Sequence, residues 1–170
     1  TTDRDDAGLY ERPHYQPGVP ATIEVPEGPL SELLETAAAF YPERVAIDFL
    51  GATTTYAGLL AASERAAQVL RDAGVHRGDR VAVLLPNCPQ HVALVYGALR
   101  IGAIVAEHNP LAPAEEVHAQ LENHGGDVVI AWEKGVELVL DPRSRAAGGT
   151  GPEADDVDPL AGRTVFSVDV

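Results

Sequence analysis

The sequence contains one cysteine (Cys88), one lysine (Lys134) and no methionine. A single cysteine excludes an internal disulfide framework and any zinc site made of several cysteines. A reaction that depends on a lysine has one candidate within these 170 residues. Because Lys134 directly follows Trp132 and Glu133, after an apolar run, we expect it to be an exposed residue at the start of a helix, without a catalytic role.

Basic residues are also few: 12 Lys and Arg stand against 26 Asp and Glu, which gives a net charge of −14. Such a charge repels phosphate backbones and anionic headgroups, so nucleic acid and membrane surfaces are excluded as first candidates for a partner. The most apolar window, residues 81–106, is long enough for a bilayer but is interrupted by Pro86, Asn87, Pro89, Gln90 and Arg100. Residues 1–11 are polar and acidic, so we expect a cytoplasmic protein without an integral membrane segment.

The hydrophobic content of the sequence, 45% of the residues, is sufficient for one hydrophobic core. Composition divides the chain into four parts. Residues 1–28 are expected to form an extended Pro-rich arm, residues 29–140 an α/β subdomain, residues 141–163 a flexible acidic loop rich in Gly and Pro, and residues 164–170 a further strand of the same sheet.

The first half of this subdomain has helical and hairpin patterns. Apolar spacing predicts helices over residues 30–41 and 56–73, and Gly74 suits a left-handed cap after the second. Between them, residues 45–49 and 53–55 predict two short strands around a turn at residues 50–52. These two strands are expected to form a hairpin.

From residue 80 onward, strand and helix patterns alternate. Continuous apolar runs at 81–85, 104–106 and 128–131 are typical of parallel strands buried on both faces, and residues 164–168 predict a fourth strand. Helices are expected after Asn87, which can cap the first of them, and after Pro113. This order predicts an α/β fold with a layered parallel sheet and flanking helices.

Ligands of such sheets bind at the carboxyl ends of the strands. The segment after the first buried strand, residues 86–89 (PNCP), has no glycine, which excludes a G-x-G-x-x-G dinucleotide turn there. The sequence also lacks a P-loop and a G-x-S-x-G nucleophile elbow, so P-loop NTPases and α/β-hydrolases are excluded.

Cys88, His91 and His108 are candidates to meet at this edge. They could form a Cys/His nucleophile pair or a three-ligand metal site, or they could be a buried cysteine, a helix-surface histidine and a loop histidine. Because the sequence has no close-spaced ligand pair such as C-x-x-C or H-x-x-x-H, we favour the second interpretation and expect no metal site.

Two further sets of polar residues are expected to be solvated. His118 and His124 lie six residues apart on one predicted helix and do not share a face. The aspartates at 155, 156 and 158 lack the spacing and the distal glutamate of a calcium loop.

Several stretches resemble the N-terminal region of the adenylate-forming superfamily, which contains acyl-CoA ligases, luciferases and adenylation domains. They are residues 54–60 (TTYAGLL), 70–83 (LRDAGVHRGDRVAV) and 85–87 (LPN), and a block over 97–131 with LRIGA, NPL, EE and LEN. Residues 15–20 (YQPGVP) are similar to the Y-x-x-G-V-P opening of bacterial long-chain fatty-acid CoA ligases. The resemblance covers residues 10–140 and resumes at 165–168.

The resemblance implies two half-reactions. ATP and a fatty acid give an acyl-adenylate and pyrophosphate, and coenzyme A then displaces AMP. ATP, Mg²⁺ and coenzyme A are therefore implied for the full-length enzyme. The family's Pro-Lys phosphate loop, ATP-binding aromatic segment, ribose-binding Asp, magnesium-binding Glu and C-terminal lysine do not occur in this sequence. We therefore expect the incomplete N-terminal subdomain of a larger two-domain enzyme, inactive alone and with no cofactor bound.

One site follows from the resemblance alone. In relatives, the loop after the second parallel strand and the segment after the third approach the CoA channel. The loop corresponds to residues 107–110 here, which makes His108 and Asn109 candidate CoA-channel residues, although Asn-Pro is also a turn signal. Some relatives place arginines in the second segment, residues 133–139, where this sequence has Glu137.

Other interpretations remain open. The chain could be a free-standing, non-catalytic α/β binding or scaffolding module, or part of a fatty-acyl-AMP ligase. An incomplete parallel sheet would expose an apolar edge, so the chain is expected to self-associate through that edge. A reading frame that continues into a Thr/Ser-Gly-Thr-Thr-Gly-x-Pro-Lys loop would favour the ligase, and a stop codon at position 171 would favour the module.

Overall fold

The computed structural model describes residues 24–25, 27–140 and 162–170. The expected arm and acidic loop, with the aspartates at 155, 156 and 158, lie almost entirely outside these ranges. The described elements, in chain order, are α1 (Glu32–Phe40), β1 (Val45–Phe49), β2 (Ala52–Thr55), α2 (Tyr56–Asp72), β3 (Arg80–Leu84), α3 (Pro89–Arg100), β4 (Ile104–Glu107), α4 (Ala114–His124), β5 (Val128–Trp132), α5 (Glu133–Leu140) and β6 (Thr164–Val168).

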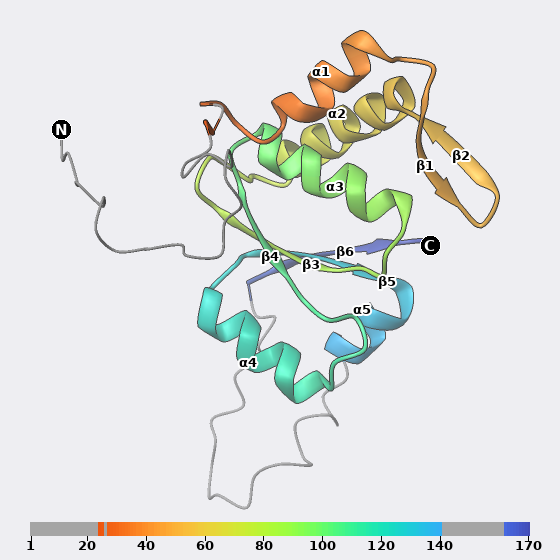
Figure 1. The fold of residues 1–170 in the computed structure, drawn as a ribbon. Helices are drawn as coiled ribbons and strands as arrows, with labels where there is room; N and C mark the ends of the chain where they lie inside the picture. Colours follow the sequence, from red (N-terminus) through yellow and green to blue (C-terminus); the bar gives the residue numbers. More distant parts are fainter. Residues whose placement is uncertain (1–23, 26, 141–161) are drawn as a thin grey trace, which may run out of the picture.

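Four of the strands form the predicted parallel sheet, in the order β4-β3-β5-β6. Each neighbouring pair is parallel, including β5 and β6, which pair from Val128↔Thr164 to Trp132↔Val168. Figure 1 shows α1, α2 and α3 on one side of this sheet and α4 and α5 on the other. The sequence-based α/β fold, with helices flanking a parallel sheet, is therefore confirmed.

The central strands β3 and β5 are buried on both faces because helices cover both sides of the sheet. Their successive side chains point alternately to the two sides. Two apolar clusters result. One lies against α2 and α3 and includes Leu70, Val81, Val83, Leu94 and Ile130. The other lies on the α4 face and includes Ala82, Leu84, Val117, Leu121 and Val129.

A separate antiparallel hairpin, β1–β2, precedes α2. Phe49 pairs with Ala52, so the turn consists of Leu50 and Gly51, with φ angles of 52° and 84°. Positive φ at both central residues is the geometry of the tight hairpin turn whose twist matches its strands. The predicted hairpin is confirmed, with the second strand beginning one residue earlier than expected.

Helix ends follow local chemistry. The N–H of Val75 bonds to the carbonyl of Leu70, and Gly74 has a φ of 86°, which confirms the predicted left-handed cap of α2. The expected cap of α3 by Asn87 is wrong: the capping position is Cys88, whose side chain makes no capping bond. Pro89 begins this helix, where a missing N–H costs no helical hydrogen bond.

Across the described ranges, no helix is both long enough and apolar enough to span a bilayer.

Candidate functional site

The carboxyl edge of the sheet carries the polar side chains that the sequence singled out. His91, in the first turn of α3, approaches the Glu107 carboxylate at the end of β4, with Nε2 at 2.9 and 3.0 Å from the two oxygens. Cys88 is buried, and both it and the His91–Glu107 pair line a pocket between α3 and the hairpin, whose apolar wall includes Phe49.

His108 does not join Cys88 and His91. It lies one residue beyond Glu107, and its side chain turns to the opposite face of the sheet, where its Nε2 is 2.9 Å from Nε2 of His124. No group of three or more His, Cys, Asp or Glu side chains that could hold a metal occurs in residues 24–25, 27–140 and 162–170. The structure thus places His91 beside Glu107 and His108 beside His124, and it does not bring the three candidate side chains together.

The two histidines of α4 differ from their expected solvated state. His118 is 9% exposed, and His124 is half-buried at the end of the helix. Besides His108, His124 contacts Gly126, whose N–H donates to Nδ1 at 3.0 Å. Burial lowers the pKa of His108, and burial followed by the charges of His108, Arg163 and Arg80 lowers the pKa of His124.

The loop after β4 is a structured turn. The Asn109 side-chain oxygen accepts the N–H of Leu111 at 3.0 Å, and its backbone oxygen accepts the N–H of Ala112. This is the turn that the Asn-Pro sequence predicts, in which the asparagine side chain replaces a backbone acceptor. Asn109 is exposed and His108 is 6% exposed, so only Asn109 of this pair faces solvent.

The segment after β5 is helix α5. Lys134 is exposed in its first turn, as expected, and its Nζ lies 5.6 Å from the centre of the Trp132 ring. Glu137 is also exposed. This surface therefore carries an acidic residue beside the basic Lys134.

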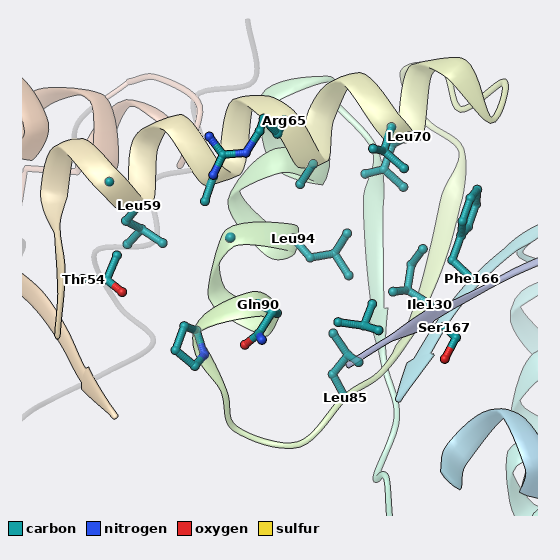
Figure 2. A pocket seen from close by; sticks show the side chains of 17 residues that line it. Thr54, Leu59, Arg65, Leu70, Leu85, Gln90, Leu94, Ile130, Phe166 and Ser167 are labelled. Atoms are coloured by element: carbon teal, nitrogen blue, oxygen red, sulfur yellow. The ribbon is translucent and has the colours of Figure 1, made fainter. Parts of the chain in front are cut away.

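A second pocket, of about 500 Å³, lies between α2, α3 and the strands β5 and β6. Figure 2 shows Leu59, Leu94, Ile130 and Phe166 around this space, with Arg65 and Gln90 as polar groups at its rim. Gln90 donates to the backbone oxygen of Asp169 at 3.0 Å, which connects α3 to the end of β6. The walls suit an apolar guest and offer no nucleophile–base pair.

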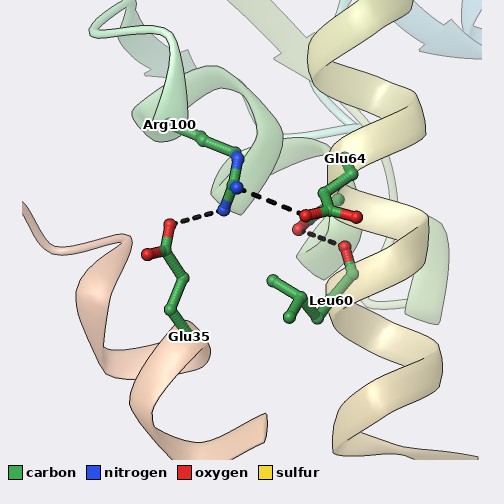
Figure 3. A network of polar contacts seen from close by, with 5 residues as sticks. Glu35, Leu60, Glu64 and Arg100 are labelled. Atoms are coloured by element: carbon green, nitrogen blue, oxygen red, sulfur yellow. Dashed lines mark hydrogen bonds and ion pairs between the residues drawn. The ribbon is translucent and has the colours of Figure 1, made fainter. Parts of the chain in front are cut away.

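The three helices on this side are connected by Arg100. It ends α3 and donates to the carboxylates of Glu35 in α1 and Glu64 in α2, the latter at 3.2 Å (Figure 3). In α2, the Ser63 hydroxyl donates to the Leu60 carbonyl at 2.8 Å. Among the described residues, no reacting group lies beside these contacts. We therefore regard them as contacts that hold the helices in position.

Comparison with known proteins shows what this scaffold is similar to. The family described as "AMP-binding enzyme" matches residues 34–164. The long-chain-fatty-acid–CoA ligase of Bacillus subtilis is 38% identical over 119 residues, which cover 70% of this chain and 21% of that enzyme. The rice (Oryza sativa) 4-coumarate–CoA ligase 3 is 43% identical over 89 residues, 52% of this chain and 16% of the relative.

A solved structure agrees with these relatives. The N-terminal domain of FACL13 from Mycobacterium tuberculosis superposes with a TM-score of 0.68 at 28% identity, and the match covers 84% of this chain and 34% of that one. The chain spans about a fifth of the length of the curated relatives it matches. It belongs to the family of AMP-binding, adenylate-forming enzymes and is homologous to the N-terminal region of their long-chain-fatty-acid–CoA ligases.

Proposed function

We propose that this chain is the leading part of the large domain of an ATP-dependent long-chain fatty-acid–CoA ligase. The enzyme would join a fatty acid to AMP with release of pyrophosphate, and coenzyme A would then displace AMP to give the thioester. The observation that carries this proposal is the 38% identity to the Bacillus subtilis ligase over 119 residues. The same proposal includes the division of the chain into an arm, an α/β subdomain, a loop and a final strand, with boundaries after residues 28, 140 and 163.

ATP, Mg²⁺ and coenzyme A would be the ligands of that reaction. Residues 24–25, 27–140 and 162–170 contain no group of three or more His, Cys, Asp or Glu side chains that could hold a metal ion. We therefore assign no magnesium ligand to this part of the chain, and we expect residues 1–170 to be inactive alone.

Coenzyme A is the ligand for which this part of the enzyme has a candidate surface. We assign the loop that begins at His108 and Asn109 to the CoA channel. Asn109 is exposed and would make the contact, while the buried His108 would position the loop through its bond to His124. The acidic Glu137 on α5 argues against phosphate binding by the neighbouring segment.

The acid substrate is proposed to be a long-chain fatty acid. The long-chain ligase match covers 70% of this chain, whereas the more identical 4-coumarate ligase match covers 52%. The match to the 4-coumarate ligase makes an aryl acid the second candidate for the acid substrate. A fatty-acyl-AMP ligase would share the first half-reaction and differ by not using coenzyme A.

Two further properties are part of the proposal. A cytoplasmic protein would have access to ATP and coenzyme A, and its net charge of −14 argues against a nucleic-acid partner. Among the described strands, β4 and β6 are the sheet edges, and β6 borders the apolar pocket of Figure 2. We expect copies of the 170-residue chain to associate through the β6 edge.

Acid-dependent exchange of pyrophosphate into ATP tests this function. Residues 1–170 should show no exchange with palmitate or with 4-coumarate, and the complete product of the same reading frame should exchange with palmitate. Exchange by residues 1–170 would contradict the missing machinery. A stop codon directly after codon 170 would contradict the ligase and favour a binding module, and a preference for 4-coumarate would contradict the long-chain assignment.

A further inference from the structure

His108 and His124 lie at the two ends of the connection that consists of the loop after β4 and helix α4. His108 follows β4, His124 ends α4, and their Nε2 atoms lie 2.9 Å apart although the residues are 16 positions apart in the chain. The rings meet edge to face, with centroids 5.1 Å apart. The contact therefore joins the start of the loop after β4 to the end of the helix that this loop precedes.

The surrounding hydrogen bonds permit one arrangement of protons. Because Gly126 donates its N–H to Nδ1 of His124, that atom has no proton, and Nε2 of His124 carries it. Nε2 of His124 must then donate to Nε2 of His108, which leaves the His108 proton on Nδ1. This Nδ1 atom is buried and has no partner of hydrogen-bond geometry, although Gln120 lies near enough to favour a charged ring.

Adding a proton to either ring breaks a bond. A proton on Nδ1 of His124 opposes the Gly126 N–H, and a proton on Nε2 of His108 opposes the proton of His124. The charged groups that act on His124 are Arg163 and Arg80, both cations. Glu107 acts on His108 by its charge, while its carboxylate is bound by His91 on the α3 side of the sheet. His118 lies on the same helix and is buried.

Arg163 fixes the same helix end by a different route. Its Nε donates to the Gly126 carbonyl at 2.8 Å, and its Nη2 donates to the Leu121 carbonyl at 3.1 Å. Since these bonds do not involve the histidine rings, the end of α4 should stay in place when the histidine pair opens. Opening should therefore affect the loop residues between His108, whose N–H bonds to the Val83 carbonyl, and the buried Ala112.

We propose that His108 and His124 form a proton-operated latch: the neutral pair holds the loop after β4 closed against the end of α4, and protonation of either ring releases it. The latch goes beyond the proposed ligase function and does not depend on it.

The direction of the pH effect follows from linkage. An unfolded histidine has a pKa of about 6.5, and the pKa of both rings is lower in the folded chain. The unfolded state therefore binds more protons between the folded and unfolded values. The stabilisation is complete above about pH 6.5 and is lost as the pH falls through that value toward the lowered pKa values.

Proton placement can be measured directly in the ¹⁵N-labelled 170-residue chain by long-range ¹H–¹⁵N NMR, with His108→Gln and His124→Gln to assign the rings. At pH 7.5 we expect the Nδ1–H form of His108 and the Nε2–H form of His124. Between pH 7.5 and 5.5, the hydrogen exchange of Leu111, corrected for its intrinsic rate, should accelerate at least about tenfold as the loop opens. The Nε2–H form of His108, or unchanged Leu111 exchange, would overturn the latch.

Unfolding by urea at several pH values gives an independent readout. In H108Q/H124Q, two amides replace the rings without titrating, so unfolding near pH 6 should take up fewer protons than in the wild type. The difference is at most about 1.5 protons, because each unfolded ring is about three-quarters protonated at pH 6. His76→Gln, at an 84% exposed histidine beside Asp79, is the matched control for replacing a histidine outside the pair. Equal slopes in all three proteins would overturn the proposal, and the NMR test holds whether or not the double variant folds.

Discussion

A Cβ atom at Gly97 would lie 2.8 Å from the backbone oxygen of Ser63, so α3 and α2 touch through bare backbone at this point. The same Cβ would be 2.8 Å from Cβ of Ala66 and 2.9 Å from the nitrogen of Ala67. Backbone atoms of a neighbouring helix cannot turn aside as a flexible side chain can. Glycine at position 97 is therefore required by packing.

Replacing Gly97 with alanine should force α2 and α3 apart. We expect Gly97→Ala to lower the free energy of unfolding by about 1–3 kcal/mol, in the range of overpacked cores. Gly58→Ala is the matched control, because its Cβ would find neighbours at 3.4 Å or more and alanine favours helix. Urea unfolding checks both variants, and equal stability of Gly97→Ala and the wild type would contradict the close contact.

A substitution in the hairpin turn should raise the free energy of unfolding. Leu50 is 92% exposed and has a φ of 52°, a conformation that asparagine tolerates better than leucine. We expect Leu50→Asn to raise the free energy of unfolding by about 1 kcal/mol, since it creates the favoured Asn-Gly turn and removes no packing. Leu50→Val should lower stability, and thermal unfolding of the pair measures the difference. A stabilising valine would show that backbone strain at this position is unimportant.

Arg100 should contribute modestly despite its two partners. Its side chain is 31% exposed, and those of Glu35 and Glu64 are 43% and 51% exposed, so solvent screens both ion pairs. We expect Arg100→Gln to cost about 0.5–1 kcal/mol, with a smaller loss in 1 M NaCl. A double-mutant cycle with Glu35→Gln measures the coupling. A loss that does not change with salt would point to packing of the arginine stem instead of charge.

Self-association through β6 is open to a direct measurement. We expect the 170-residue chain to sediment as a concentration-dependent oligomer at physiological ionic strength, where screening reduces repulsion between copies of charge −14. Ser167→Lys places a charge on this edge strand at an exposed position and should shift the distribution to monomer. Leu111→Lys, at an 82% exposed position on the loop after β4, is the control and should leave association unchanged. Monomeric wild-type chain would contradict the edge contact.

Much of the fold follows from local patterns in the sequence. The apolar runs of β3 and β5 predict strands buried on both faces because a parallel sheet covered by helices leaves neither face to water. Gly74 predicts the end of α2 because few other residues adopt a positive φ there. In both cases the physical cause acts within a few residues, so the pattern can be read from the chain.

The candidate site was harder to predict because it depends on relative positions. His108 and His124 are 16 residues apart on different elements, and their contact depends on where α4 ends over the sheet. The available signal was a histidine at a strand end followed by one at the end of the next helix. Similarly, nothing in the spacing of Glu35, Glu64 and Arg100 indicates that three helices converge there.

The central claim is that these residues form the N-terminal part of an acyl-CoA ligase, and a chimera tests it most directly. Residues 34–164 of this chain would replace the matching segment of the Bacillus subtilis long-chain-fatty-acid–CoA ligase, alongside the parent enzyme and the parent with that segment deleted. We expect the chimera to retain palmitate-dependent exchange of pyrophosphate into ATP, and the deletion to have none. A chimera that is folded by circular dichroism and monodisperse, yet shows no exchange with any fatty acid, would contradict the claim.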